Sequence, residues 1–299
     1  MDIKVTFLGT GSAKPTKKRN HPGILISYGS ENLLVDCGEG IQRQFKIAGI
    51  NPCNLTKILI THWHGDHTLG LAGLLSTLVM SEYSKTLKIY GPKGTKEKIK
   101  LLEKIYGRFR ISFEVKEIEG KFIDEKLFYI ESANMSHGIP AKAYSIIIKD
   151  KLRINKSKLK KLKLPNGPLL GKIQQGKDII HPETKKKIKS KDITYLEKGK
   201  KLTIVMDTAL NEKAIKLAKN SDLLICEATF LSESQEKAKA YKHLTAKQAA
   251  SIAKKAKAKK LILTHFSNRY EKNTKPHLTE AKKTFKNTII ANDFDSIKI

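Results

Sequence analysis

The densest group of residues that could do chemistry lies at residues 61–67, Thr-His-Trp-His-Gly-Asp-His. Three imidazoles and one carboxylate fall within six residues there, just after the apolar segment Lys57–Ile60, which predicts a buried strand. Imidazole and carboxylate groups are good ligands for zinc and similar divalent ions. The spacing differs from that of zinc fingers and of the helical His-Glu-x-x-His motif, and ligands packed so tightly suit two adjacent ions. We expect a sharp turn at Gly65 that lets these side chains point inward together.

Three further candidate ligands, His137, Asp207 and His265, each lie just beyond a segment that predicts a strand. Active-site residues of layered α/β proteins collect at the ends of strands, so these side chains could converge with those of residues 61–67. Taken singly, each could also be an ordinary capping or turn residue. Taken together, they supply the ligands that two ions would still need.

The elements that must position these residues alternate along the chain, which predicts an α/β protein. The predicted strands are 3–8, 24–27, 33–35, 57–60, 87–90, 127–131, 143–149, 202–206, 223–226 and 261–263, with more near the C-terminus. The predicted helices are 39–48, 69–81, 96–106, 212–219, 245–257 with Thr245 as its N-cap, and one near 279–285. Each half contains an apolar strand that ends in Thr-His, which hints at a duplicated αβ unit.

The composition changes between the two groups of strands. Residues 151–177 contain nine basic residues and no acidic one, and more lysines follow up to residue 191. Such a segment is expected to bury little of itself. We interpret residues 150–195 as a protruding arm or a long mobile insertion within a single domain that covers residues 1–299. An ordinary disordered insertion without a role is the alternative.

The formal net charge of +29 favours a polyanionic partner, and nucleic acid is the obvious one. Only six of the 58 basic residues are arginine, and genome composition or a high growth temperature would also explain so strong a bias toward lysine. The longest apolar stretch, Leu69–Met80, is too short to cross a membrane. With no signal peptide visible, the expected location is the cytoplasm.

The sequence of residues 62–67 matches the His-x-His-x-Asp-His signature of the metallo-β-lactamase superfamily, whose fold is a four-layer αβ/βα sandwich. The resemblance implies two zinc ions, and manganese or cobalt would accept similar ligands. Two such cations lower the pKa of bound water and neutralise charge in the transition state, which suits phosphodiester hydrolysis. One ion would be bound by His62, His64 and His137, the other by Asp66, His67 and His265, and Asp207 would bridge the two.

Other blocks, in order from Phe7 to Tyr270, resemble the tRNase Z family in its short form. Two positions depart from the family pattern, because Ile41 stands for a threonine and Cys226 for a histidine. The matching blocks are residues 7–12, the Pro-x-Lys-x-Arg-Asn loop at 15–20, the Asp-Cys-Gly-Glu-Gly block at 35–44, Cys-Glu-Ala-Thr at 226–229, His-Leu-Thr at 243–245, residues 264–270, and Gly167-Pro168, which is similar to the tip of the family's tRNA-binding arm.

The resemblance implies a zinc-dependent endoribonuclease that removes the 3′ trailer of precursor tRNA near the discriminator nucleotide. The products would be a 3′-hydroxyl on the tRNA and a 5′-phosphate on the trailer. Asp66 would accept a proton from the attacking water, and His243, oriented by Glu227, would protonate the leaving oxygen. A structural reading of Glu227 and His243 stays open, as a strand-end carboxylate and a helix-entry histidine.

Residues in the matching blocks are also candidates for RNA contacts, and the arm would hold the tRNA elbow by shape and charge. The family implies a homodimer in which the arm of one subunit holds the tRNA that the other cuts. Phe266 could stack on a base near the cut. The candidate contacts are Lys17, Arg19, Asn20, Arg43, Gly167, Pro168, Phe266 and Arg269.

Two alternatives remain. A small-molecule phosphodiesterase or arylsulfatase would share every metal ligand but would not need the basic arm or the Pro-x-Lys-x-Arg-Asn loop. A non-catalytic RNA-binding module would have no reason to keep all seven ligands. The sequence leaves open whether tRNAs that already contain CCA are cut.

Overall fold

The computed structural model describes residues 2–164 and 167–299. The chain divides into two compact units. The core unit consists of Met1–Asp124, Ile130–Ile146 and Lys201–Ile299, and the arm unit consists of Glu125–Tyr129 and Ile147–Lys200.

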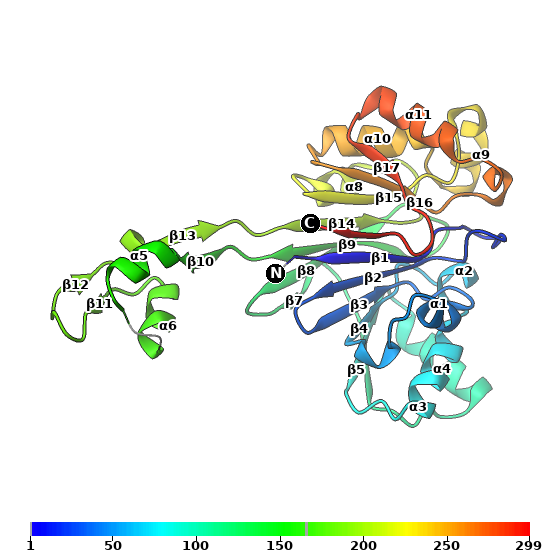
Figure 1. Cartoon of the computed structure of the whole chain (residues 1–299). Coiled ribbons are helices and arrows are strands. Elements are labelled where there is room, and N and C mark those ends of the chain that lie inside the picture. Colours follow the sequence, from blue (N-terminus) through cyan, green and yellow to red (C-terminus); the bar gives the residue numbers. More distant parts are fainter. Residues whose placement is uncertain (1, 165–166) are drawn as a thin grey trace. The chain divides into compact units, whose positions relative to one another are not determined.

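The first sheet of the core unit has the strand order β18-β1-β2-β3-β4-β5-β6 (Figure 1). Strands β1 to β3 form antiparallel pairs, whereas β3 to β6 run parallel. Parallel neighbours need crossover connections, and helices α1, α3 and α4 provide them. The strands are β1 (Lys4–Gly9), β2 (Gly23–Tyr28), β3 (Glu31–Val35), β4 (Lys57–Leu59), β5 (Leu87–Gly91), β6 (Phe113–Glu117) and β18 (Ser296–Lys298).

The second sheet has the order β17-β16-β15-β14-β9-β8-β7, and its strands β14 to β17 run parallel. Helices α8, α10 and α11 make the crossovers, so each sheet contains four consecutive parallel strands joined by helices. This repetition agrees with the duplicated αβ unit at which the sequence hints. The strands are β7 (Lys121–Asp124), β8 (Phe128–Met135), β9 (Ala141–Ile148), β14 (Lys201–Val205), β15 (Leu223–Glu227), β16 (Leu261–Thr264) and β17 (Thr288–Ile290).

The core unit has four layers, because the two sheets lie against each other and each carries helices on its outer face (Figure 1). The hydroxyl of Tyr144 on β9 donates to the carbonyl of Ile60 after β4, which ties one sheet to the other. The predicted αβ/βα sandwich is confirmed. The helices are α1 (Ile41–Ile47), α2 (Gly65–Thr68), α3 (Leu71–Met80), α4 (Thr95–Tyr106), α8 (Glu212–Ala218), α9 (Gln235–Tyr241), α10 (Ala246–Lys255) and α11 (Lys275–Thr284), with short 3-10 turns at Pro52–Asn54, Ser232–Ser234 and Asn268–Tyr270.

Local sequence explains how several helices begin. The predicted N-cap of α10 is confirmed, because the Thr245 hydroxyl accepts from the backbone of Gln248 while the Gln248 side chain accepts from the backbone of Thr245. Helix α11 begins earlier than the predicted 279–285, with Pro276 in its first turn, where proline needs no hydrogen-bond donor. Helix α9 was not predicted, because it buries only Ala238 and so shows no apolar periodicity.

The arm unit has a small core of its own, made of Leu164, Ile173, Ile179, Ile188 and Ile193. The expectation that this segment buries little of itself is therefore wrong. Aliphatic residues spaced among the lysines meet in one cluster while the ammonium groups stay outside. Its elements are β10 (Lys151–Ile154), α5 (Lys156–Lys161), α6 (Pro168–Gln174), β11 (Ile179–Ile180), β12 (Lys187–Ile188), α7 (Ser190–Ile193) and β13 (Thr194–Glu197), with β10 antiparallel to β13 and β11 antiparallel to β12.

Candidate metal centre and catalytic dyad

The histidine-rich loop connects β4 to α2. His62 and His64 precede the helix, whereas Asp66 and His67 lie within it. The backbone changes from extended at His64, with φ −71° and ψ 153°, to helical at Gly65. Gly65 does not have a positive φ, so the expected glycine turn is wrong. This change from extended to helical backbone at His64 sets the directions of two pairs of side chains, His62 with His64 and Asp66 with His67.

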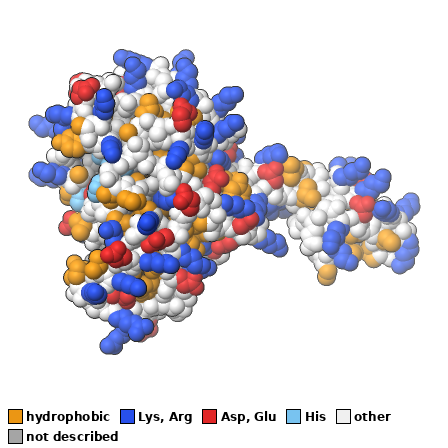
Figure 2. Space-filling model, turned by 180° about the vertical axis from the view of Figure 1, so that it is seen from behind, with side chains coloured by type: hydrophobic (Ala, Val, Ile, Leu, Met, Phe, Trp, Pro, Cys, Tyr) orange, Lys and Arg blue, Asp and Glu red, His pale blue; other side chains and the backbone are white. Residues whose placement is uncertain are grey.

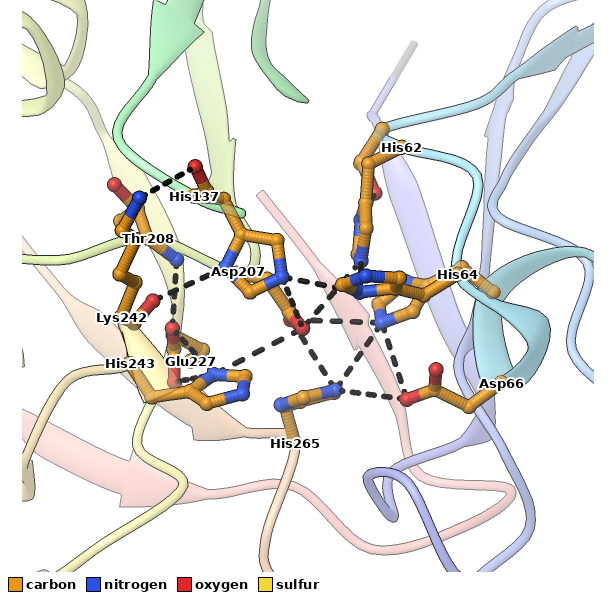
Figure 3. Close-up of polar contacts among 12 residues, drawn as sticks. His62, His64, Asp66, His137, Asp207, Thr208, Glu227, Lys242, His243 and His265 are labelled. Atoms are coloured by element: carbon orange, nitrogen blue, oxygen red, sulfur yellow. Dashed lines mark hydrogen bonds and ion pairs between the residues drawn. The ribbon is translucent and has the colours of Figure 1, made fainter. Parts of the chain in front are cut away.

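All seven predicted ligands come together at the ends of strands of both sheets (Figure 3). They form two groups that share Asp207, and within each group the candidate ligand atoms lie within 4.8 Å of one another. Asp207 Oδ1 lies 3.2 Å from His265 Nε2, and its Oδ2 lies 3.6 Å from His62 Nε2, so each carboxylate oxygen faces a different group. The groups are His62, His64, His137 and Asp207, and Asp66, His67, Asp207 and His265.

The nitrogen that points away from the centre is held in each of three histidines. His67 Nδ1 lies 2.7 Å from a carboxylate oxygen of Asp36, and His265 Nδ1 lies 2.9 Å from the hydroxyl oxygen of Thr229. His137 Nδ1 donates to the carbonyl of Lys242. Such outer partners fix the ring and leave the other nitrogen free to bind a metal.

The inward nitrogens of the histidines converge within hydrogen-bond distance of one another. His64 Nδ1 lies 3.0 Å from His62 Nε2 and 3.1 Å from His137 Nε2, while His67 Nε2 and His265 Nε2 are 3.2 Å apart. In addition, the buried Oδ1 of Asp207 has no hydrogen-bond partner among the described residues. A cation in each group would satisfy these nitrogens and this oxygen, so the donor set fits two metal ions.

The charges within the centre favour bound cations. Burial lowers the pKa of His62 well below its usual value, which leaves a neutral imidazole. Burial also opposes a charge on His67, but Asp207 and Asp36 raise its pKa well above the usual value. Although burial works in the other direction, His265 and His67 hold the pKa of Asp207 well below its ordinary range. The carboxylates therefore stay ionised and attract positive charge.

Beside the ligands, His243 and Glu227 form a hydrogen-bonded pair. His243 Nδ1 lies 3.1 Å from Glu227 Oε1, and Glu227 is fully buried. Burial disfavours a charge on His243, but Glu227 and Asp207 raise its pKa to about 9. The His243 side chain is 15% exposed, so its ring is not fully enclosed. This is the geometry that a general acid oriented by a carboxylate needs.

Two residues that were not among the predicted site residues, Asp36 and Thr229, hold this site in place. Asp36, at a positive φ of 59° after β3, accepts from the backbone and hydroxyl of Thr61 and binds His67. Thr229 donates to Glu227 and contacts His265. Both lie in sequence blocks that resemble the family, and that was the only signal that could have found them.

Two predicted RNA contacts are not supported by the structure, because Arg19 and Phe266 are buried. Arg19 donates to the hydroxyl of Thr10 and to the carbonyl of Ala291, and its guanidinium lies 4.7 Å from the centre of the Phe266 ring. Phe266 is only 1% exposed and also packs on His277. These side chains anchor the loop that carries them, and neither is open to a phosphate or a base.

The other predicted contacts differ in exposure. Lys17, Arg43 and Arg269 are exposed, although the guanidinium of Arg269 also lies over the Phe230 ring. Asn20 is half-buried and donates to the carbonyl of Glu39, so it shapes its loop. In the arm unit, Gly167 precedes α6 and Pro168 is its first residue.

Comparison with known proteins agrees with this site. A ribonuclease Z from Archaeoglobus fulgidus is 38% identical, and the match covers 100% of this chain and 98% of that protein. This chain belongs to the ribonuclease Z family. The membership confirms the tRNase Z-type endoribonuclease predicted from the sequence. Residues 3–157 also match the family described as Anti-Pycsar protein Apyc1, and that part of the chain belongs to it as well.

Solved structures of this fold are similar over the whole chain. The short form of human tRNase Z has a TM-score of 0.71 and 28% identity, with 98% of each chain covered. A metallo-β-lactamase fold protein from Bacillus subtilis has a TM-score of 0.72 and 20% identity, with 100% of this chain and 99% of that chain covered. The latter shows the fold alone. Across the part of the chain that the structure describes, helices long and apolar enough for a membrane span are absent.

Proposed function

We propose that this protein removes the 3′ trailer of precursor tRNA near the discriminator nucleotide, leaving a 3′-hydroxyl on the tRNA and a 5′-phosphate on the trailer. One observation carries the proposal. Two metal-ligand groups that share Asp207 lie beside the His243–Glu227 pair, in a chain 38% identical to a ribonuclease Z over its full length. A binding module without catalysis would need neither feature.

The ligand groups would hold two zinc ions, with manganese or cobalt as substitutes. His62, His64 and His137 would bind the first, Asp66, His67 and His265 the second, and Asp207 would bridge them. When bound, the ions supply Lewis acidity, which lowers the pKa of water and neutralises charge on the phosphate in the transition state.

The residues of this chain then divide the proton transfers between them. Asp66, whose carboxylate lies 3.4 Å from His67 Nε2 and 3.6 Å from His265 Nε2, accepts the proton of the attacking water. His243 gives a proton to the leaving 3′ oxygen of the tRNA, and Glu227 holds the imidazole through Nδ1 and stabilises its charged form. Thr229 fixes the Glu227 carboxylate from the other side with a 2.5 Å hydrogen bond.

Recognition of the tRNA rests on exposed cations. Lys17, Arg43 and Arg269 lie in the matching blocks of the core unit and would contact phosphates near the cut. The arm unit, whose α5 is Lys-Ser-Lys-Leu-Lys-Lys, would bind the tRNA elbow, and Gly167-Pro168 at the start of α6 would take part. Figure 2 shows lysine and arginine side chains across the surface.

We also propose a homodimer that acts in the cytoplasm. Its support is an exposed apolar set on α1 and around α3, where Ile47, Leu69 and Met80 are 49%, 63% and 77% exposed. Large aliphatic side chains exposed on neighbouring helices are candidates for an interface between subunits. Sedimentation should show a dimer that Met80→Glu dissociates, and a monomeric wild type would end this part of the proposal.

The deciding experiment is cleavage of a labelled precursor tRNA that carries a 3′ trailer, with metal content measured on the same preparation. We expect one cut at or near the discriminator, and its loss in Asp66→Ala. Raising the salt should weaken binding, with log K falling by roughly 0.7–0.9 per log unit of salt for each phosphate contacted. If two metals bind but no cut occurs, the alternative is a small-molecule phosphodiesterase or arylsulfatase, whose turnover should be nearly insensitive to salt.

A further inference from the structure

A cavity of about 540 Å³ lies in the core unit, beside the metal ligands but outside the machinery described above. This volume falls within the roughly 300–1,000 Å³ that is typical of small-ligand sites. Its walls come from the β5–α4, β6–β7 and β8–β9 connections. The lining residues are Pro92, Lys93, Glu117, Ile118, Glu119, Asn134, Met135, Pro140, Ala141 and Lys142.

Hydrogen bonds at two places join the walls of this cavity to the histidine-rich loop. The backbone N–H of Lys142 donates to the carbonyl of Thr61, the residue before His62. The indole of Trp63 donates to the hydroxyl of Thr95, which in turn donates to the carbonyl of Pro92 in the wall. Met135 and Pro140 also stand on either side of His137 in the chain. The walls of the cavity are therefore tied to the loop that carries His62 and His64, and two lining residues flank His137 in the chain.

The lining suits a neutral, flat, polar-edged ligand. Its two lysines and two glutamates balance in formal charge, so a bare phosphate would gain little from the cavity as a whole. Pro92, Ile118 and Met135 offer apolar surface, and the amide of Asn134 can both donate and accept. A nucleobase has apolar faces and an edge of donors and acceptors, which matches this combination.

The ammonium of Lys142 has only a distant ion partner, although its side chain is buried. The Lys142 side chain is only 5% exposed, and the ion partner of its ammonium among the described residues is Glu119, 3.9 Å away. Glu119 is 77% exposed and also accepts a 2.8 Å hydrogen bond from Asn134. Buried ammonium groups normally have closer partners. An exposed carboxylate can move aside, so Lys142 and Asn134 are available to hydrogen-bond a ligand that enters.

We propose that this cavity binds the base of the first trailer nucleotide, the one 3′ to the scissile phosphate. This inference rests on the proposed function. His243, which protonates the oxygen on the tRNA side of the phosphate, pairs with Glu227 at the end of β15. His243 also packs against His137, with ring centroids 5.3 Å apart, whereas the walls of the cavity are joined to the histidine-rich loop at Thr61 and Trp63. The scissile phosphate joins the tRNA to the first nucleotide of the trailer. The trailer is unpaired, so the base of this nucleotide is free to turn into a cavity.

The test compares single-turnover cleavage of two precursor tRNAs, one intact and one abasic at the first trailer nucleotide. The wild type should cut the abasic substrate about tenfold more slowly, because the lining groups lose their partners. In Asn134→Ala that penalty should shrink to about twofold, since one of these partners is already gone. Lys142→Met, which keeps the aliphatic length of the side chain, should shrink it as well.

The control is Asn273→Ala, because Asn273 is an equally exposed asparagine that lines a different groove, and it should keep the full abasic penalty. Equal rates on both substrates in the wild type would overturn the inference, and so would an undiminished penalty in both cavity variants. If the wild type cuts neither substrate, the proposed function itself has failed. Thermal denaturation and metal content of each variant separate these outcomes from loss of the fold.

Discussion

The core unit and the arm unit carry charge in opposite ways. In the core unit the site charges are buried and held by neighbours, as Glu227 is by His243, Thr229 and the backbone of Thr208. In the arm unit the charges are mostly exposed lysines around a small aliphatic core. Hydrolysis needs a few groups at fixed positions, whereas binding to a phosphate backbone needs positive charge spread over a surface. The comparison predicts that core variants change chemistry and arm variants change RNA affinity.

The largest effect should follow from removing the imidazole of His243. His243→Ala should lower the single-turnover rate on precursor tRNA by about 10²–10⁴-fold, because the leaving oxygen loses its proton donor. Both metal ions should remain bound, since the ligand groups would be intact. Metal analysis alongside rapid-quench kinetics measures both quantities. Full turnover with both ions present would return His243 and Glu227 to a purely structural role.

Replacing residues 150–195 with a short Gly-Ser linker tests the other side of the comparison. Cleavage of precursor tRNA at subsaturating concentration should fall on the order of 10²-fold, because many phosphate contacts disappear together. Hydrolysis of bis(p-nitrophenyl) phosphate should change by less than about twofold, since the arm would supply only remote binding energy. Equal losses on both substrates would show that the two units do not divide the work in this way.

A smaller effect is expected from Asp36, which touches no substrate. Asp36→Asn keeps the size of the side chain but removes the charge beside His67 Nδ1, 2.7 Å away. Loss of such an outer carboxylate typically costs about 10–100-fold in metal affinity. Competition with a chelator measures the affinity directly. The control is Glu31→Gln. Glu31 pairs with Lys57 on the same sheet but lies outside the site, so this substitution should leave metal affinity unchanged.

The sequence predicted the strands and helices of the core unit well, because buried strands such as β4 and β16 are continuous aliphatic runs. It also singled out the seven candidate ligands that the structure brings together in two groups, since imidazole and carboxylate are common ligand types and all seven come after predicted strands. It failed where a residue's type does not disclose its surroundings. Arg19 resembles a phosphate contact in sequence, yet only the folded chain shows Asp293, Asn292 and the Phe266 ring around it.

The small core of the arm unit escaped prediction for a related reason. Its isoleucines, such as Ile173 and Ile188, are far apart in the sequence and separated by lysines, so no window shows a clear period. Composition suggested disorder, whereas burial of a few such side chains suffices to give a small core. The role of Thr229 was missed because it too depends on contacts that form only in the folded chain. Its partners, Glu227 and His265, come from two different strands.

The core unit also contains a buried histidine, His277, that has no role in the proposed reaction but should lower the stability of the fold in acid. His277 packs between the rings of Phe266 and Tyr270, and neither of its ring nitrogens has a hydrogen-bond partner among the described residues. Burial, helped by the charge of Arg19, lowers its pKa from 6.5 to about 4. The unfolded chain therefore binds a proton at a higher pH than the folded chain does.

The sign follows from that order of pKa values. Above pH 6.5 His277 is neutral in both states, and as the pH falls from 6.5 to 4 protonation of the unfolded chain removes stability. At pH 5 the loss should be about 2 kcal/mol. His277→Phe, which keeps an aromatic ring at this position, should remove that part of the acid dependence, as urea denaturation at pH 7.5 and pH 5 would show. An equal loss in wild type and variant would mean that His277 finds a polar partner when the protein is in water.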